Sequence, residues 1–438
     1  MKLEYLIYAS FTLLIHLGIS IWYVRQLNRD SRWWWMMPIY FGMSWNVVSL
    51  VVIEYGFYIT EQGTFSSQTG AALRYLLFVL PVGLVFRAIG SRPARDPAVP
   101  NGIPEKSGAV EVLALGACGV VVALLTVNSV LSPSGWSGGV DRFNWWENSR
   151  FPRLQLITGT VCWPVVYGLG ILLANFTRRK ETTLRLAVMV VAAFYLFFLV
   201  RMGQKFNGLT VPVFALFLPI ACVQGFQLRA TFRSLFESQF RQRLILGTLF
   251  FTMVVTGLGF LVYRWFDLNA QSASVGLDVI DTLLYRAFVI QAHSYFGADY
   301  LHFRDNFTPE EGLRVFDQLQ FSSIQTVMGL VGDLALVESY NERGVRYATI
   351  HPSFAVLVGG IPGALILSTV IGAIMAVAAR WFQSGLNQRS PLLQFCAGNL
   401  VFCAYGLFMM GEVTLLLSVK FLAPFAIGCA MVLMGSKR

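Results

Sequence analysis

The stretch AVEVLALGACGVVVALLTVNSVL, residues 109–131, is apolar along almost its whole length. The hydrocarbon core of a bilayer is about 30 Å thick, and a helix needs about 20 apolar residues to cross it. This run is long enough, so it predicts a transmembrane helix. Similar runs occur along most of the chain, and together they predict an all-α polytopic integral membrane protein.

The overall composition supports this prediction. The chain has 438 residues, of which 56% are hydrophobic and only 13% are charged, and its mean hydropathy is +0.61. That leaves too little polar surface to cover a water-soluble protein of this size. The formal net charge of +10 does not indicate nucleic-acid binding, because the basic residues lie mainly in short loops between apolar runs. The six cysteines lie within or beside apolar runs and lack the close pairing of a metal site.

The apolar runs predict about eleven transmembrane helices. The first run has no small-residue cleavage signal and is interpreted as a retained span rather than a signal peptide. The predicted spans are 4–24, 36–58, 71–89, 109–131, 154–175, 184–200, 209–228, 244–263, 353–379, 392–411 and 413–434.

Three regions follow from this pattern: eight spans with short loops over 1–263, one large loop over 264–352, and three further spans over 353–438. More than half of the 33 lysines and arginines lie in one alternate set of loops, which should be cytoplasmic. This places the N-terminus outside, the C-terminus inside and the large loop outside. A loop of that length is expected to contain helices and a function.

One part of the large loop combines a histidine and an arginine on a predicted helix. Over residues 278–297 the apolar spacing is helical, and Arg286, Ile290, His293 and Gly297 fall on one face. We expect this apolar helix to lie against the outer boundary of the membrane or to dip into it, where Arg286 and His293 could contact one substrate together. The alternative is that Arg286 pairs with a nearby aspartate and that His293 is simply solvated.

Two further outer loops are rich in charge. RMGQKFNG, residues 201–208, places Arg201 and Lys205 one turn apart near the hydrocarbon, where an anion such as a diphosphate would compensate them. The alternative is that these long side chains merely reach lipid headgroups. Arg343 lies in the loop before the span at 353–379, and the alternative there is a basic, water-facing loop end.

The loop that precedes the span at 154–175 mixes aromatic and charged residues. Aromatic rings can cover the apolar faces of sugars while carboxylates and arginines bond the hydroxyls, which predicts a glycan-binding segment. Tryptophans that only anchor the protein at the bilayer boundary are the alternative. The candidate glycan-binding residues are Asp141, Arg142, Trp145, Trp146, Glu147 and Arg150.

Familiar motifs for metal binding, phosphate binding and nucleophilic catalysis are absent from the sequence. It has no zinc-type His/Cys spacing, no GxxxxGK[ST] phosphate loop and no G-x-S-x-G elbow. It also lacks the closely spaced acidic pairs that would hold a divalent cation. We therefore expect metal-free chemistry without a cofactor.

Taken together, these features resemble the O-antigen polymerase family, whose members polymerise lipid-linked oligosaccharide repeat units. The resemblance rests on the many spans with one large late periplasmic loop, on DRFNWWENS (141–149) and on RMGQKFNG (201–208). Arg286 and Gly297 also match an Arg, ten residues, Gly spacing found in some members. Over most of the chain the likeness is architectural, and the matching motifs are short.

The resemblance implies a GT-C-like fold of the O-antigen polymerase and ligase type, in a bacterial inner membrane, with the active site facing the periplasm. It implies metal-independent, inverting glycosyl transfer from undecaprenyl diphosphate, which extends an O-antigen or similar polysaccharide. The expected partners are the lipid-linked oligosaccharide, membrane lipid and a chain-length regulator protein. The candidate diphosphate ligands are Arg201, Lys205, Arg286 and Arg343.

The resemblance also suggests catalytic roles. Arg286 would stabilise the departing diphosphate, and His293 would act as the base, by analogy with ligases that use a loop histidine near arginines. Asp141, Glu147 or Asp299 could take the role of base instead.

Two other functions remain open from the sequence. An O-antigen ligase would transfer the same donor glycan to lipid A core, and sequence barely separates it from a polymerase. A non-enzymatic transporter of lipid-linked sugars predicts repeated halves and ionisable residues near mid-span. We find no repeat and few charges deep in a predicted span, Lys420 being the plainest.

Overall fold

The structure, a computed structural model, describes residues 3–55, 70–90, 108–135, 144–204, 206–224, 290–319, 322–332, 337, 350–388 and 390–435. All regular structure in these ranges is helical, and none of it is strand. The first half contains α1 (Leu3–Arg29), η1 (Ser31–Met36), α2 (Met37–Glu54), α3 (Ala71–Gly90), α4 (Ala109–Leu131), η3 (Pro152–Leu154), α5 (Gln155–Arg178), α6 (Thr182–Arg201) and α7 (Phe206–Gln224). The second half contains α12 (Ile290–Phe303), α13 (Pro309–Gln318), α14 (Ser323–Val331), α16 (Ser353–Asn387), α17 (Pro391–Met410), η4 (Val413–Leu417) and α18 (Val419–Gly435).

The described helices make this a multi-pass membrane protein. Seven of them are long and apolar enough to cross a bilayer: α1, η1 with α2, α3, α4, α6, α16 and α17. The described apolar parts of α5, α7 and α18 are shorter. These ten match ten of the predicted spans, whereas the predicted span 244–263 lies outside the described residues. The outward faces are apolar, as contact with lipid requires: Leu14 is 65% exposed and Leu113 is 72% exposed.

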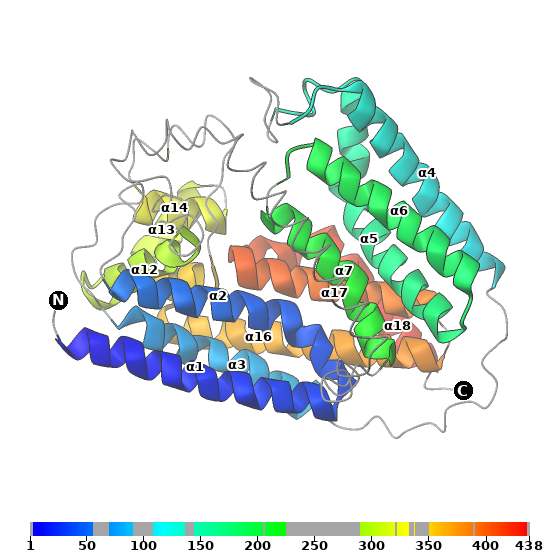
Figure 1. The fold of residues 1–438 in the computed structure, drawn as a ribbon. Helices are drawn as coiled ribbons and strands as arrows, with labels where there is room; N and C mark the ends of the chain where they lie inside the picture. Colours follow the sequence, from blue (N-terminus) through cyan, green and yellow to red (C-terminus); the bar gives the residue numbers. More distant parts are fainter. Residues whose placement is uncertain are drawn as a thin grey trace, which may run out of the picture.

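The helices form two groups joined by α17 (Figure 1). In what we call the α16 group, α16 packs on α3, with α1 and α2 beside α3, and with α12, α13 and α14 on the first part of α16. In the α5 group, α5 packs on α4, α6 and α7. Because α17 contacts α16, α2 and α5, it forms the centre of the bundle, and most of its side chains are buried.

One end of the bundle, which we call the α12 end, contains α12 to α14, the last residue of α2 (Glu54) and the start of α3. In Figure 1 the N-terminus and α12 to α14 lie on the left and the C-terminus lies on the right. Helices α12, α13 and α14 belong to the segment 264–352, so the expectation of helices in that segment is confirmed.

A break in α16 shapes the α12 end. Gly360 has φ 59° and ψ −153°, a conformation that only glycine adopts without strain, and Pro362 follows it. The helix therefore consists of two parts that meet at this residue. A Cβ at Gly360 would lie 3.3 Å from Cε1 of His302, so α12 packs directly against the break.

Candidate functional site at the α12 end

Helix α12 is buried rather than laid on the membrane boundary. Every residue from Ala292 to Asp299 is buried, and the helix contacts α2, α3, α14 and α16. His293, Ser294 and Asp299 are 1%, 3% and 0% exposed, respectively. Buried polar groups require partners, so this helix carries its polar side chains into the protein and not into lipid. The expected surface position of this helix is therefore wrong for its described part.

The main polar contact of α12 is an ion pair with α3. Nε of Arg74 donates to Oδ1 of Asp299 at 2.7 Å, and Nη2 donates to Oδ2 at 2.6 Å. This fork-to-fork geometry is the strongest form of arginine–carboxylate pairing. The Asp299 side chain is 0% exposed, whereas 28% of the Arg74 side chain is exposed. The pair therefore fixes the guanidinium of a partly exposed arginine at the α12 end.

Aromatic groups surround the same pair. The guanidinium of Arg74 lies 4.6 Å from the centroid of the Phe303 ring, within the range of cation–π attraction. The hydroxyl of Tyr295 donates to Oδ1 of Asp299 at 3.3 Å. Burial, and then the Asp299 carboxylate, raises the pKa of Tyr295 well above its usual value, so its hydroxyl stays protonated and donates. Oδ1 of Asp299 thus accepts from both Arg74 and Tyr295, and Oδ2 accepts from Arg74.

Residues of α2 and α3 complete the cluster. The rings of Tyr75 and Tyr295 meet edge to face at 5.4 Å, and Nδ2 of Asn46 donates to the Tyr75 hydroxyl at 2.9 Å. Oε1 of Glu54 accepts from the backbone N–H of Ala72 at 3.2 Å, which satisfies a donor in the first turn of α3. Glu54 is 1% exposed. We call the whole set the Arg74 cluster: Asn46, Glu54, Arg74, Tyr75, Tyr295 and Asp299.

The predicted catalytic residues are only partly described. Arg286 lies outside the described residues, so its alignment with His293 stays a prediction. Burial lowers the pKa of His293 to about 4, which leaves the imidazole neutral at pH 7. Asp299, an alternative base, accepts hydrogen bonds from Arg74 at both carboxylate oxygens, and its role as a base stays a prediction.

Arg201 lies in the α5 group and caps a helix. Its Nε and Nη2 donate to the carbonyl of Ser129 at 3.3 and 3.1 Å, and Nη2 also donates to the carbonyl of Ser132 at 3.1 Å. Those carbonyls belong to the end of α4, where a cation satisfies orphan acceptors and the negative end of the helix dipole. Lys205 and Arg343 lie outside the described residues. Diphosphate binding by these three residues stays a prediction.

The two tryptophans of the predicted glycan-binding segment are used in packing. Trp145 is 0% exposed and Trp146 is 7% exposed, and both rings contact Phe198 of α6. The indole N–H of Trp145 donates to the carbonyl of Pro133 at 2.8 Å. Their rings therefore stabilise the loop and are not offered to a sugar on the surface.

The charged members of the same segment differ from the tryptophans. Glu147 and Arg150 are exposed, and the backbone N–H of Arg150 donates to Oγ of Ser132 at 2.8 Å. Asp141 and Arg142 lie outside the described residues. Glycan binding by these four charged residues is still a prediction.

A second buried histidine lies where α16 begins. Oγ of Ser368 donates to the carbonyl of Phe78, so it accepts from Nε2–H of His351 at 2.6 Å. Burial lowers the pKa of His351 to about 3, and its ring is 0% exposed. This histidine connects the residues before α16 to α3, which is a structural task.

Sequence reasoning missed the Arg74 cluster, although a signal was present. Arg74 and Glu54 both fall within predicted spans, 71–89 and 36–58, and ionisable residues in a span indicate a functional or paired site. The partner of Arg74 is 225 residues away, so no local pattern could identify it.

Comparison with known proteins adds one partial match. Residues 318–424 are similar to a family of unknown function, DUF6418. This region runs from the end of α13 through α14, α16 and α17 into α18, and it includes the break at Gly360 and the His351 contact. No curated protein and no solved structure matches the chain.

Proposed function

We propose that the protein is a membrane glycosyltransferase that polymerises undecaprenyl-diphosphate-linked repeat units of an O-antigen or similar polysaccharide. In this proposal it has about eleven spans in a GT-C-like arrangement and acts at the periplasmic face of the bacterial inner membrane. The observation that carries the proposal is Arg74, whose guanidinium is fixed by a fully buried carboxylate while its side chain is still 28% exposed at the α12 end.

The reaction explains why a fixed arginine would be useful. The terminal hydroxyl of a new repeat unit attacks the anomeric carbon of the donor glycan, and the bond from that carbon to the diphosphate oxygen breaks with inversion. The diphosphate leaves with the electron pair of this bond, and the hydroxyl proton passes to a base. Preorganised cations stabilise the departing diphosphate without reorganisation at the moment of reaction.

Arg74 joins Arg201, Lys205, Arg286 and Arg343 as a proposed diphosphate ligand. Asp299 positions it, because both carboxylate oxygens bind its Nε and Nη2. The ring of Phe303 covers one face of the guanidinium. The outward part of Arg74 is thereby held in one orientation, as recognition of a diphosphate at a partly dry site requires.

His293 stays the proposed base. Its lowered pKa keeps the imidazole neutral at pH 7, so the ring can accept a proton, but a pKa of about 4 makes it a weaker base than free imidazole. A base of this kind contributes less than the positioned arginines, and we expect His293→Gln to slow the reaction less than changes at Arg74.

The test is chain growth by the purified protein. The detergent-solubilised protein is incubated with undecaprenyl-diphosphate repeat units and EDTA, and the products are separated by length. A ladder of longer glycans supports the proposal. Transfer only to added lipid A core would instead indicate an O-antigen ligase, and no transfer to either acceptor would favour a transporter.

Two arginine variants localise the activity. Arg74→Lys keeps the charge but loses the planar guanidinium that binds Asp299 through two nitrogens. We expect chain growth to slow by about tenfold or more, because a preorganised donor to the transition state is lost. The matched control is Arg314→Lys, because Arg314 is an exposed arginine on α13 at the same end.

Arg286→Ala should abolish chain growth while the amount of protein in the membrane stays normal. Unchanged growth would remove Arg286 from the site.

A further inference from the structure

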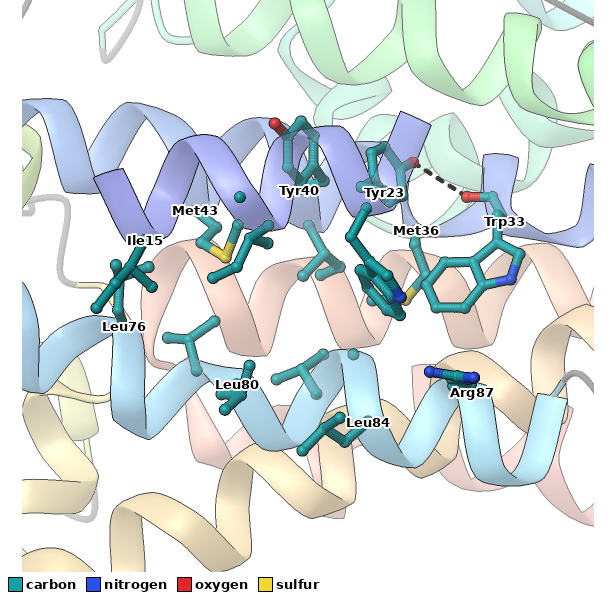
Figure 2. Close-up of a pocket in the computed structure, with 17 residues that line it drawn as sticks. Ile15, Tyr23, Trp33, Met36, Tyr40, Met43, Leu76, Leu80, Leu84 and Arg87 are labelled. Atoms are coloured by element: carbon teal, nitrogen blue, oxygen red, sulfur yellow. Dashed lines mark hydrogen bonds between the residues drawn. The ribbon is translucent and has the colours of Figure 1, made fainter. Parts of the chain in front are cut away.

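An apolar groove lies between α1, α2 and α3, on the outside of the α16 group. Its volume is about 390 Å³, and its walls include Ile15 and Gly18 of α1, Met43 of α2, and Leu76 and Leu80 of α3 (Figure 2). Leu80 is 42% exposed, and a Cβ on Gly18 would have no atom within 4 Å. The groove is therefore open space on a lipid-facing surface and not a packed interior.

The groove has a charged residue at one end. Figure 2 shows Arg87 and Trp33 at this end, whereas Ile15 and Leu76 lie at the other. At the same end of the groove, on the wall opposite Arg87, the hydroxyl of Tyr23 donates to the carbonyl of Trp33 at 3.0 Å (Figure 2). An arginine with tryptophan and tyrosine neighbours at the end of an apolar channel is typical of the boundary between hydrocarbon and headgroups.

The length of the groove matches one leaflet. From Leu76 to Arg87 is eleven residues of helix, or about 16 Å at 1.5 Å per residue. Half of a hydrocarbon core of about 30 Å is about 15 Å. One extended acyl chain of a single leaflet would therefore fill the groove, with its headgroup at Arg87.

The direction of α3 identifies the leaflet. Helix α3 begins at the α12 end, beside Glu54, and Arg87 lies in its last turn at the opposite end. The distribution of basic residues predicts that this opposite end is cytoplasmic. We propose that the groove binds one acyl chain of an anionic phospholipid of the cytoplasmic leaflet, with Arg87 contacting the phosphate. This site is independent of the proposed glycosyl transfer.

Native mass spectrometry of the purified full-length protein tests this proposal. Dioleoyl phosphatidylglycerol and dioleoyl phosphatidylethanolamine are added in equal amounts, and the lipid that stays bound is identified. The wild type should retain one phosphatidylglycerol in preference to phosphatidylethanolamine. Arg87→Gln should weaken that preference by about fivefold, because one arginine near a headgroup contributes about that factor.

A second variant closes the groove itself. Gly18→Phe should reduce retention of both lipids, because the ring occupies the open space beside α3. The matched control is Gly116→Phe on the outer face of α4, since a Cβ there also has no atom within 4 Å. For the charge change, the control is Arg25→Gln, because Arg25 is an exposed arginine of α1 outside the groove lining.

Three results would overturn the proposal. Lipid retention by Gly18→Phe equal to that of the wild type would show that the groove is not the site. Displacement of phosphatidylglycerol by an equal amount of undecaprenyl phosphate would assign the groove to a polyprenyl carrier. A wild-type dimer that becomes a monomer in Gly18→Phe, with lipid retention unchanged, would assign it to a second copy of the chain.

Discussion

Two ion pairs, Arg74–Asp299 and Arg179–Glu111, join helices at opposite ends of the bundle. In the first the arginine is 28% exposed and the carboxylate 0%, whereas in the second the values are 13% and 6%. Glu111 also accepts from Nδ2 of Asn175 at 3.1 Å, and the same Nδ2 lies 3.5 Å from Oε1 of Gln394. The Arg179 pair is therefore enclosed by polar groups from α5 and α17, while the Arg74 pair leaves more of its arginine side chain exposed.

The difference separates a structural contact from a candidate site. Both pairs hold together helices that are distant in the sequence, and both are costly to break once desolvated. Of these two pairs, the one at the α12 end keeps the larger part of its arginine side chain exposed, 28% against 13%.

Loss of Arg74 should destabilise the fold more than loss of Arg179. Arg74→Gln removes both guanidinium hydrogen bonds from the fully buried Asp299, which keeps the hydrogen bond from the Tyr295 hydroxyl, and we expect a loss of about 3 kcal/mol of unfolding free energy. Arg179→Gln leaves Glu111 with donors from Asn175 and from the backbone of Gly108, and should cost about 1 to 2 kcal/mol. Thermal unfolding in one detergent measures both, and an equal or larger loss in Arg179→Gln would contradict this ranking.

Acid should weaken the α12 end before the opposite end. An unfolded histidine binds a proton below about pH 6.5, but burial lowers the pKa of His293 to about 4 and that of His351 to about 3. Below pH 6.5 the unfolded state therefore binds more protons than the folded state. The stability that is present above pH 6.5 is lost progressively as the pH falls toward about 4 for His293 and about 3 for His351. At pH 5 each histidine should lower the free energy of unfolding by about 2 kcal/mol relative to its value above pH 6.5.

Hydrogen exchange at pH 7.5 and pH 5 checks this acid effect. Amides of α12 should lose protection at pH 5 while those of α5 keep theirs, and His293→Gln should reduce the difference. The same loss of protection in α5 as in α12, or no change in His293→Gln, would show that these histidines are not responsible.

The break in α16 should tolerate no side chain at Gly360. Gly360→Ala forces a positive φ on a residue with a Cβ and brings that carbon to 3.3 Å from His302, so we expect a loss of about 2 kcal/mol. The neighbouring Gly359→Ala is the control, because its Cβ would meet no atom within 4 Å. Comparable melting temperatures for the two variants would show that the backbone at Gly360 accommodates a side chain without strain.

The helices were predictable from the sequence because the information for them is local. An apolar run of about 20 residues is both the signal and the cause of a spanning helix, and ten of the predicted spans coincide with described helices. By contrast, the glycan-binding role predicted for Trp145 rests on the composition of its own loop alone. Its burial depends on Phe198 of another helix, which no local pattern reveals.

The candidate site was much less predictable because its contacts join distant segments. Asp299 was considered only as a base, and its partner Arg74 was not singled out, since 225 residues separate them. The sequence predicts that Arg201, near the hydrocarbon, is compensated by an anion such as a diphosphate. The structure compensates it with the carbonyls of Ser129 and Ser132, which depends on how α4 and α6 pack.

The most direct test of the account is the affinity of the purified protein for undecaprenyl diphosphate, measured for the wild type, Arg74→Lys and Arg179→Lys below their melting temperatures. The account predicts that Arg74→Lys binds about tenfold more weakly, which corresponds to about 1.4 kcal/mol, and that Arg179→Lys binds like the wild type. Equal affinity of the wild type and Arg74→Lys would contradict the claim that the accessible arginine at the α12 end receives the diphosphate.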